Sequence, residues 1–208
     1  PMLDCEGRRN VSQPLIVFSP IVNHRLNDSA FVESPNQSAR PDGVEIDLLV
    51  IHNISLPPGK FGTSCIAELF CNTLDCSSHP YFEQLRELKV SAHVLIARNG
   101  MITQFVPFDR KAWHAGQSCF QGRKNCNEFS IGIELEGTDF EAFDDRQYEA
   151  LSALTGRLMQ AYHGLTVERI VGHSDIAPGR KTDPGPYFNW ERFRESLSDY
   201  SESADSAK

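Results

Sequence analysis

The sequence has no long hydrophobic run, and its charge balance is not basic. No stretch approaches the roughly 18–20 consecutive apolar residues that a membrane-spanning helix needs, so we expect no membrane span. Lys and Arg number 20 against 28 Asp and Glu, which gives a formal net charge of −8. A nucleic-acid-binding face is basic, so we expect neither a nucleic-acid partner nor binding to an anionic membrane surface.

The sequence also lacks the pattern of a secretory signal. Such a signal begins with basic residues and continues with roughly 7–15 apolar residues in a row. Here Asp4 and Glu6 come first, and the apolar run at residues 15–18 lies between Pro14 and Pro20. We therefore expect the protein to act in the cytoplasm.

The six cysteines include no Cys-x-x-Cys pair of the kind that zinc knuckles use. Six cysteines are enough to form three disulfides. However, a chain of 208 residues can bury a sizeable core without them, and reduced thiols are the usual state in the cytoplasm. We expect free thiols that are mostly small buried hydrophobes.

Length and composition predict one α/β domain with two extensions. Hydrophobic residues make up 40% and charged residues 23% of the chain, which is ordinary for a globular domain. Residues 1–43 are rich in Pro, Asn and Ser, and we expect them to form an N-terminal arm that wraps or dangles. Residues 44–198 are expected to form the domain, and the polar residues 199–208 a flexible tail.

Hydrophobic periodicity predicts strands interspersed with helices, and therefore a mixed central β-sheet flanked by helices. Asn99-Gly100, between two apolar runs, predicts a hairpin. Gly132 indicates a close backbone approach within its strand. The expected strands cover residues 46–52, 91–98, 102–106, 129–135 and 169–172, and the expected helices residues 64–71, 80–88, 144–163 and 187–197.

Two histidines follow buried strands, at the edge where open α/β sheets bind ligands. His52 follows LLVI and His173 follows RIVG. A catalytic zinc takes about three protein ligands and keeps one position open, and Asp183 can supply the third ligand from the loop after His173. Taken singly, each histidine is equally explained as a buried hydrogen-bonded group, and Asp183 as a turn residue.

Two carboxylates and a lysine extend this candidate site. Glu134 and Glu136 share one face of an expected strand. A carboxylate in an apolar strand is costly unless it is used or paired, so the pair offers a general base; the alternative is two rim carboxylates. Lys181 lies two residues before Asp183, close enough to stabilise an oxyanion; alone, it would be interpreted as a solvated loop lysine.

Five motifs, in chain order, carry a family resemblance: IHNISLPPGKFG, SAHVLI, FVPFDRKAWHAG, FSIGIELEG and GHSDIAPGRKTDPGP. Together they resemble the AmpD-type N-acetylmuramoyl-L-alanine amidases, which share the peptidoglycan-recognition-protein fold, over about residues 46–195. The resemblance implies a single α/β domain with a mixed central sheet flanked by helices. It also implies hydrolysis of the amide bond between N-acetylmuramic acid and L-alanine in muropeptides.

The resemblance assigns roles to residues that match the motifs. It implies Zn²⁺ ligands at His52, His173 and Asp183. It further implies that Glu134 is the general base and that Lys181 stabilises the tetrahedral intermediate.

The candidate substrate contacts are Asn53, Lys89, Trp113 and His114. For His114 a hydrogen-bonding role behind the metal ligands is an equal alternative. Arginines are common in the family at the positions of Lys89 and Asn125, so the contacts to the peptide end depart from the family pattern.

The expected substrate is a small molecule, a 1,6-anhydro-N-acetylmuramyl-peptide of cell-wall recycling, and the expected enzyme is a monomer. The alternative is a muropeptide-binding module without catalysis, but such a module would lack a zinc ligand. A purely structural zinc protein would have a closed site of four ligands, and no fourth ligand is evident. His93 is expected to be structural.

Overall fold

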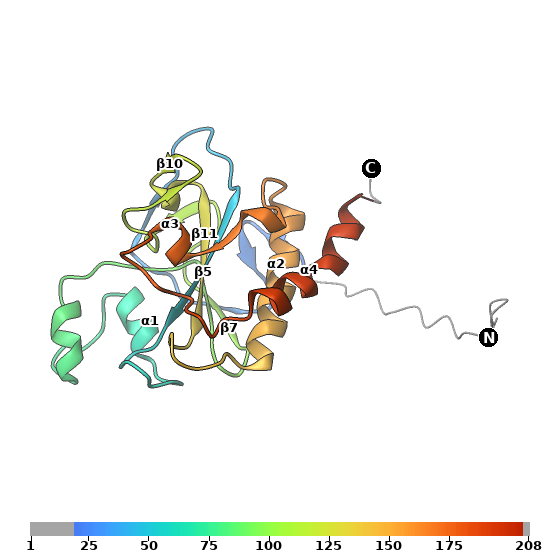
Figure 1. Cartoon of the computed structure of the whole chain (residues 1–208). Helices are drawn as coiled ribbons and strands as arrows, with labels where there is room; N and C mark the ends of the chain where they lie inside the picture. Colours follow the sequence, from blue (N-terminus) through green and yellow to red (C-terminus); the bar gives the residue numbers. More distant parts are fainter. Residues whose placement is uncertain (1–18, 206–208) are drawn as a thin grey trace, which may run out of the picture.

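A six-stranded mixed β-sheet forms the centre of the molecule (Figure 1). The computed structural model describes residues 19–205. In spatial order the strands are β12 (Ile170–Gly172), β5 (Leu48–Ile54), β11 (Ser130–Glu136), β6 (Val94–Ile96), β7 (Ile102–Gln104) and β3 (Ala30–Phe31). β12, β5, β11 and β6 run parallel, whereas β6 and β7 are antiparallel. The expected mixed sheet is therefore confirmed.

Alternation along the central strands sorts their side chains onto two faces. The odd-numbered residues at the centres of β5 and β11 belong to the main hydrophobic core. Helices α2 (Asp145–Ala161) and α4 (Trp190–Asp205) contribute to the same core and lie on one side of the sheet (Figure 1). Leu48 and Val50, which are even-numbered, belong to a different cluster. The opposite face is thus left to the side chains of His52 and of the even-numbered residues of β11.

The long helix α2 begins where the sequence predicts. The Asp144 carboxylate accepts a hydrogen bond from the Arg146 N–H, and the Gln147 side chain accepts one from the Asp144 N–H. This capping box satisfies amide groups that have no partner within the helix.

The last helix differs from its expected range, 187–197. α4 begins at Trp190 and continues to Asp205, so it includes residues 199–205, which were expected to belong to the flexible tail. A polar composition does not by itself prevent a helix from continuing once its first turns are packed, and the buried Phe193 and Leu197 pack α4 on the core.

The remaining helices are short: α1 (Cys65–Phe70), α3 (His173–Ile176) and the 3₁₀ turns η1 (Pro80–Leu85), η2 (Cys126–Glu128) and η3 (Val167–Arg169). The hairpin between β6 and β7 is confirmed, with Ile96 opposite Ile102. Gly100 in its turn has a φ of +81°, and a Cβ there would also meet the Arg146 carbonyl oxygen at 2.8 Å. The Asn-Gly signal therefore has both a conformational and a steric reason.

The part of the N-terminal arm that is described packs against the domain. β3 pairs with β7 at the edge of the sheet, and β4 (Gln37–Ala39) pairs with β8 (Arg110–Ala112). Two further small ribbons join β1 (Ile21–Val22) to β2 (Arg25–Leu26) and β9 (Cys119–Phe120) to β10 (Arg123–Lys124). Residues 1–18 lie outside the described residues, and the division into arm, domain and tail stays a prediction.

Arg40 ties the end of the arm to the domain. Its guanidinium group donates hydrogen bonds to the carbonyl oxygens of Phe108, Asn127, Glu128 and Ser130. Burial lowers the pKa of Arg40 to about 10, so the group remains charged at neutral pH. One side chain thus supplies donors to four carbonyl groups on two segments, one at Phe108 and one at residues 127–130.

Replacing Arg40 with Met should lower the free energy of unfolding by about 3 kcal/mol, because carbonyl groups lose a charged donor inside the protein. Urea denaturation measures this change. Arg86→Met is the matched control, since its ion pair with Glu83 is exposed and should contribute less than about 1 kcal/mol. Equal losses in the two variants would contradict the structural role of Arg40.

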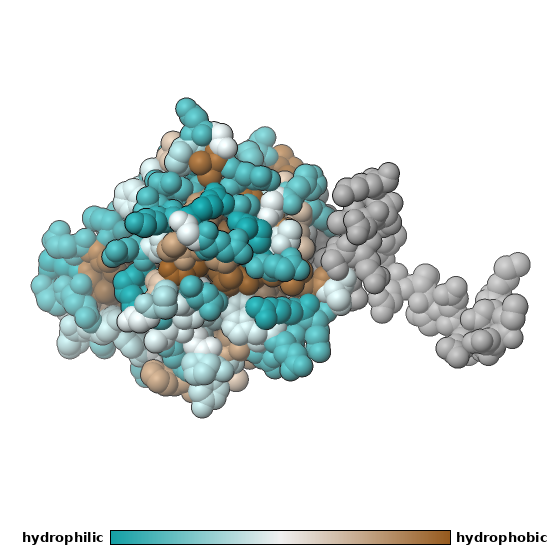
Figure 2. Space-filling view, turned by 45° about the horizontal axis from the view of Figure 1, so that its top comes forward, coloured by the Kyte–Doolittle hydropathy of each residue, from teal (hydrophilic) through white to brown (hydrophobic). Residues whose placement is uncertain are grey.

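The surface is mostly hydrophilic, with a hydrophobic band across the middle of the face in Figure 2. Among the helices within residues 19–205, none has both the length and the apolar character required to cross a membrane. The five cysteines in this part of the chain have free thiols.

Candidate active site

Three side chains from separate elements converge on the face opposite α2 and α4. His52 comes from β5, His173 begins α3 directly after β12, and Asp183 lies in the following loop. The two Nδ1 atoms are 2.9 Å apart and lie 2.9 and 3.0 Å from Asp183 Oδ2. The structure thus brings together the three predicted ligands in a group that can hold a metal ion.

His52 does not end its strand, as the sequence had suggested. β5 continues to Ile54 because β11 pairs with it up to Glu136. On its other side β12 ends at Gly172, which lies opposite Ile51. His52 is therefore the first residue of β5 beyond the end of β12, and this step in the sheet edge gives it access to the loop after β12.

The donor atoms suit a zinc ion. His173 Nε2 lies 3.1 Å from the carbonyl oxygen of Ala115, which can only accept, so the neutral ring carries its hydrogen on Nε2. Its Nδ1 lone pair then faces His52 Nδ1 and the Asp183 carboxylate. Lone pairs held this close are unfavourable unless a cation or a proton lies among them, and two imidazoles with one carboxylate form a known catalytic zinc set.

The electrostatic environment favours the protonation states in which these side chains can bind a metal ion. Burial lowers the pKa of His52 to about 4, against the opposing effect of Asp183, so its ring is neutral at pH 7. Burial alone would raise the pKa of Asp183, but the close contacts with the His173 and His52 rings outweigh it and hold the pKa below its usual range. Neutral imidazoles and an ionised carboxylate are the forms that bind metals.

Glu134 faces the same cleft from the neighbouring strand. It lies directly opposite His52 in the parallel register of β11 and β5. Its Oε2 atom is enclosed and has no hydrogen-bond partner among the described residues. Burial raises the pKa of Glu134 well above its usual value; Asp183 raises it further and Lys181 opposes the shift. A carboxyl group whose pKa is raised in this way holds a proton more readily than an ordinary glutamate, which suits an acid–base role.

Glu136 has a different environment, although it shares a face with Glu134. Its two carboxylate oxygens accept hydrogen bonds from the backbone N–H groups of Gly62, at 2.6 Å, and Arg98, at 3.1 Å. The structure thus separates the two candidate carboxylates: Glu136 holds two loops together, whereas Glu134 faces the cleft.

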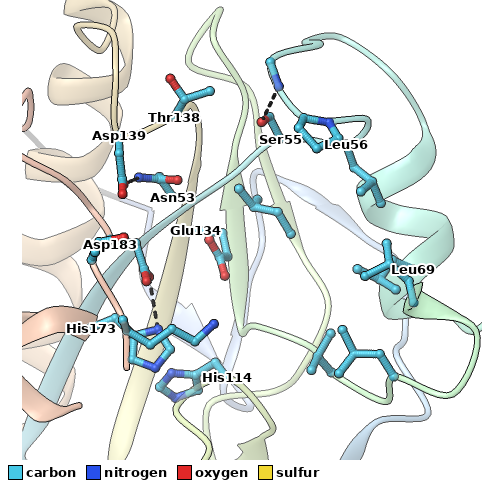
Figure 3. A pocket seen from close by; sticks show the side chains of 18 of the residues that line it. Asn53, Ser55, Leu56, Leu69, His114, Glu134, Thr138, Asp139, His173 and Asp183 are labelled. Atoms are coloured by element: carbon cyan, nitrogen blue, oxygen red, sulfur yellow. Dashed lines mark hydrogen bonds and ion pairs between the residues drawn. The ribbon is translucent and has the colours of Figure 1, made fainter. Parts of the chain in front are cut away.

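A cleft of about 850 Å³ surrounds this group and has two unlike walls. In Figure 3, Asn53, Asp139 and Asp183 lie on one side of Glu134, and Leu56 and Leu69 lie on the other. The other lining residues include Lys181 and the large side chains of Phe70, Tyr81, Leu85, Leu88 and Val90. Such a cleft suits a ligand with both polar and apolar surfaces.

The predicted substrate contacts occupy different places in this cleft. Asn53 and Trp113 line it, and both also brace the structure. The Asn53 amide donates to Asp139 Oδ1 at 2.7 Å, and the Trp113 indole N–H donates to Ser38 Oγ at 3.1 Å. Lys89 is exposed in the loop between the lining residues Leu88 and Val90 but does not itself line the cleft.

His114 also lines the cleft, but its ring is buried and both of its nitrogens are engaged. Nδ1 lies 2.9 Å from His52 Nε2, and Nε2 lies 3.1 Å from Ser130 Oγ. This arrangement favours the alternative role for His114, in which it forms hydrogen bonds behind the candidate metal ligands, over a contact with substrate.

Residues 42–186 match the family model described as N-acetylmuramoyl-L-alanine amidase. The chain belongs to this family. The amidase is 55% identical over 167 residues to the 1,6-anhydro-N-acetylmuramyl-L-alanine amidase AmpD of Escherichia coli (strain K12), covering 80% of this chain and 91% of that protein. The enzyme class implied by the motifs is confirmed: the protein is a hydrolase of the N-acetylmuramoyl-L-alanine amidase type.

Solved structures agree with this assignment. The crystal structure of a selenomethionine AmpD derivative superposes on the amidase with a TM-score of 0.84 at 51% identity, covering 86% of this chain and all of that one. The AmiD amidase of E. coli superposes with a TM-score of 0.55 at 30% identity, covering 76% of this chain and 60% of that one.

The sequence did not indicate several residues that support the site of the amidase. Ser38 comes from the arm and fixes Trp113, and Asn127 accepts hydrogen bonds from the backbone N–H groups of His114 and Ala115. Such residues carry no local signal, because their role depends on partners that are distant in the chain.

His93 is structural, as expected, and should make the stability of the amidase pH-dependent. Its Nδ1 accepts from the Gly132 N–H, and its Nε2 faces the Arg110 carbonyl oxygen. Burial, followed by the charge of Arg40, lowers the pKa of His93 from 6.5 to about 3. The ring of His114 is the other titratable group that packs against it.

Because the pKa is lower in the folded protein, the unfolded chain binds more protons below pH 6.5. The contribution of His93 to the free energy of unfolding is therefore fully present above this pH and is lost as the pH falls toward 3. Between pH 7.5 and 5.5 the wild type should lose about 1.4 kcal/mol more than His93→Gln. Urea denaturation of both proteins at the two pH values measures this; parallel losses would show that His93 is not the responsible group.

Proposed function

We propose that the amidase is a zinc-dependent enzyme that hydrolyses the bond between 1,6-anhydro-N-acetylmuramic acid and L-alanine in muropeptides released during cell-wall recycling. The observation that carries this proposal is the convergence of His52, His173 and Asp183 beside Glu134 in one cleft. The activities for which relatives are named support the substrate class. The E. coli relative is named for the 1,6-anhydro substrate, and the AmiD structure is described as a complex with anhydro-N-acetylmuramic acid-L-Ala-D-gamma-Glu-L-Lys.

In this proposal His52, His173 and Asp183 hold the zinc ion. When bound, zinc supplies a Lewis acid that polarises a carbonyl group and lowers the pKa of water to roughly 7. Glu134 accepts the proton of the attacking water and later delivers it to the leaving nitrogen. Lys181 places its ammonium group near the oxygen on which negative charge develops. The C–N bond breaks, giving the lactyl carboxylate of the sugar and the free amine of L-alanine.

The substrate contacts and the setting remain part of the proposal. Asn53 and Trp113 contact the muropeptide from the lining of the cleft, and Lys89 approaches it from the rim. His114 is the fourth candidate contact, although its engaged ring favours another role. We further propose that the enzyme acts as a monomer in the cytoplasm, which size-exclusion chromatography and cell fractionation can test.

Mass spectrometry of anhydromuramyl-tripeptide after incubation with the protein tests the proposed reaction. Free tripeptide should appear, should be suppressed by a chelator, and should return when zinc is added back. Intact cell-wall fragments serve as the comparison substrate. Hydrolysis that persists after complete metal removal would contradict zinc dependence, and cleavage of wall fragments in preference to the anhydro substrate would contradict the proposed specificity.

A further inference from the structure

A chain of buried hydrogen-bonding groups lies behind the proposed metal ligands. It runs from His52 Nε2 to His114 Nδ1, at 2.9 Å, and from His114 Nε2 to Ser130 Oγ, at 3.1 Å. All three residues are at least nine-tenths buried. None of these contacts takes part in the chemistry described above.

Two neighbouring histidines have their tautomers fixed by backbone groups. In His173 the Nε2 faces a carbonyl oxygen, so this atom carries the hydrogen. In His93 the Nδ1 accepts from a backbone N–H, so here too the hydrogen is on Nε2. Among the described residues, His52 has no backbone partner of this kind. Its Nδ1 faces Asp183 and His173 in the candidate metal group, and its Nε2 faces His114, so His114 is the contact outside that group that can set its tautomer.

The chain of hydrogen bonds can run in two directions, with opposite consequences. In one direction Ser130 donates to His114, His114 donates from Nδ1 to His52 Nε2, and His52 carries its hydrogen on Nδ1. In the other direction His52 donates from Nε2 to His114 Nδ1, and His114 donates from Nε2 to Ser130 Oγ. Only the second direction leaves the lone pair of His52 Nδ1 free for a metal.

The His114 ring is held rigidly in the place that this role requires. Its backbone N–H and that of Ala115 both donate to Asn127 Oδ1, at 3.1 and 2.8 Å. The ring lies directly on the backbone of Gly132, where a Cβ would lie no more than 2.7 Å from three ring atoms. A side chain that contacts substrate has no need of this enclosure, whereas a side chain that orients another ring does.

We propose that His114, backed by Ser130, is a positioning residue that fixes the tautomer and orientation of His52 by accepting its Nε2 hydrogen. This inference rests on the zinc ion of the proposed function. It concerns the affinity of the empty site for the metal, so it can be tested without substrate.

The test compares zinc dissociation constants, measured by competition with a chelator, for four variants. His114→Leu removes the acceptor and should weaken zinc binding by about 10–100-fold. His114→Asn keeps an acceptor oxygen near the position of Nδ1 and should recover most of the loss. Ser130→Ala should cause a smaller loss in the same direction. Ser152→Ala removes a buried hydroxyl paired with Ser196, away from the site, and should have no effect on zinc binding.

Nitrogen-15 NMR of the histidine rings in the zinc-loaded wild type gives an independent readout that needs no variant to fold. Both His52 and His114 should carry their hydrogen on Nε2. A hydrogen on His114 Nδ1 would overturn the proposal. A folded His114→Leu protein with unchanged zinc affinity and a raised KM would also overturn it, because that result marks a substrate contact. A zinc-binding protein that hydrolyses no muropeptide would overturn the proposed function but leave this inference standing.

Discussion

Glu134→Gln should lower kcat by about 10²–10⁴-fold, because an amide cannot accept and return a proton. The substitution preserves size and leaves the three proposed metal ligands in place, so zinc content and the unfolding midpoint should stay near those of the wild type. The structure makes Glu134 the candidate through its place opposite His52, its raised pKa and its enclosed Oε2, which has no hydrogen-bond partner among residues 19–205.

Glu141→Gln is the matched control for this prediction. Glu141 also lines the cleft, but it is exposed, and its side chain accepts a hydrogen bond from the Thr138 hydroxyl at 3.3 Å. Its variant should retain nearly full activity. Initial rates with the anhydromuramyl-tripeptide, together with a zinc assay, distinguish the two positions. If Glu134→Gln keeps more than a tenth of the wild-type kcat, another group is the base.

The sequence predicted the central strands because their signals are local. Apolar runs mark β5 and β11, and the two-residue periodicity places alternate side chains on one face. The pairing of Glu134 opposite His52 then depends on register, which sequence periodicity alone does not determine. It was the family resemblance that connected these residues with Asp183 before the fold was known.

Other parts of the fold carried no local signal. The strands β1, β2 and β3 have two residues each, too few for any periodicity, and they form through pairing with distant segments. The difference between Glu134 and Glu136 likewise depends on the backbone amides of Gly62 and Arg98, which lie far away in the chain. The engagement of both His114 nitrogens depends on the three-dimensional contacts with His52 and Ser130.

Gly132→Ala adds only one methyl group, but it should lower both the free energy of unfolding and the affinity for zinc. The new Cβ would lie no more than 2.7 Å from three atoms of the His114 ring, which is fixed at both nitrogens and at its backbone. The ring must move, and overpacking of this kind typically costs about 1–3 kcal/mol. We expect a matching fall in the free energy of unfolding and, because the contact to His52 is disturbed, weaker zinc binding.

A double-mutant cycle separates this clash from any general intolerance of β11 to substitution. In a His114→Ala background the ring is gone, so adding Ala at position 132 should cost little. The coupling energy, obtained from urea denaturation of the two single variants and the double variant, should therefore be at least about 1 kcal/mol. Additive losses would mean that Gly132 is needed for the strand itself. A strong coupling would instead show that Gly132 in FSIGIELEG is matched to His114 in WHAG, linking two motifs that are separate in the sequence.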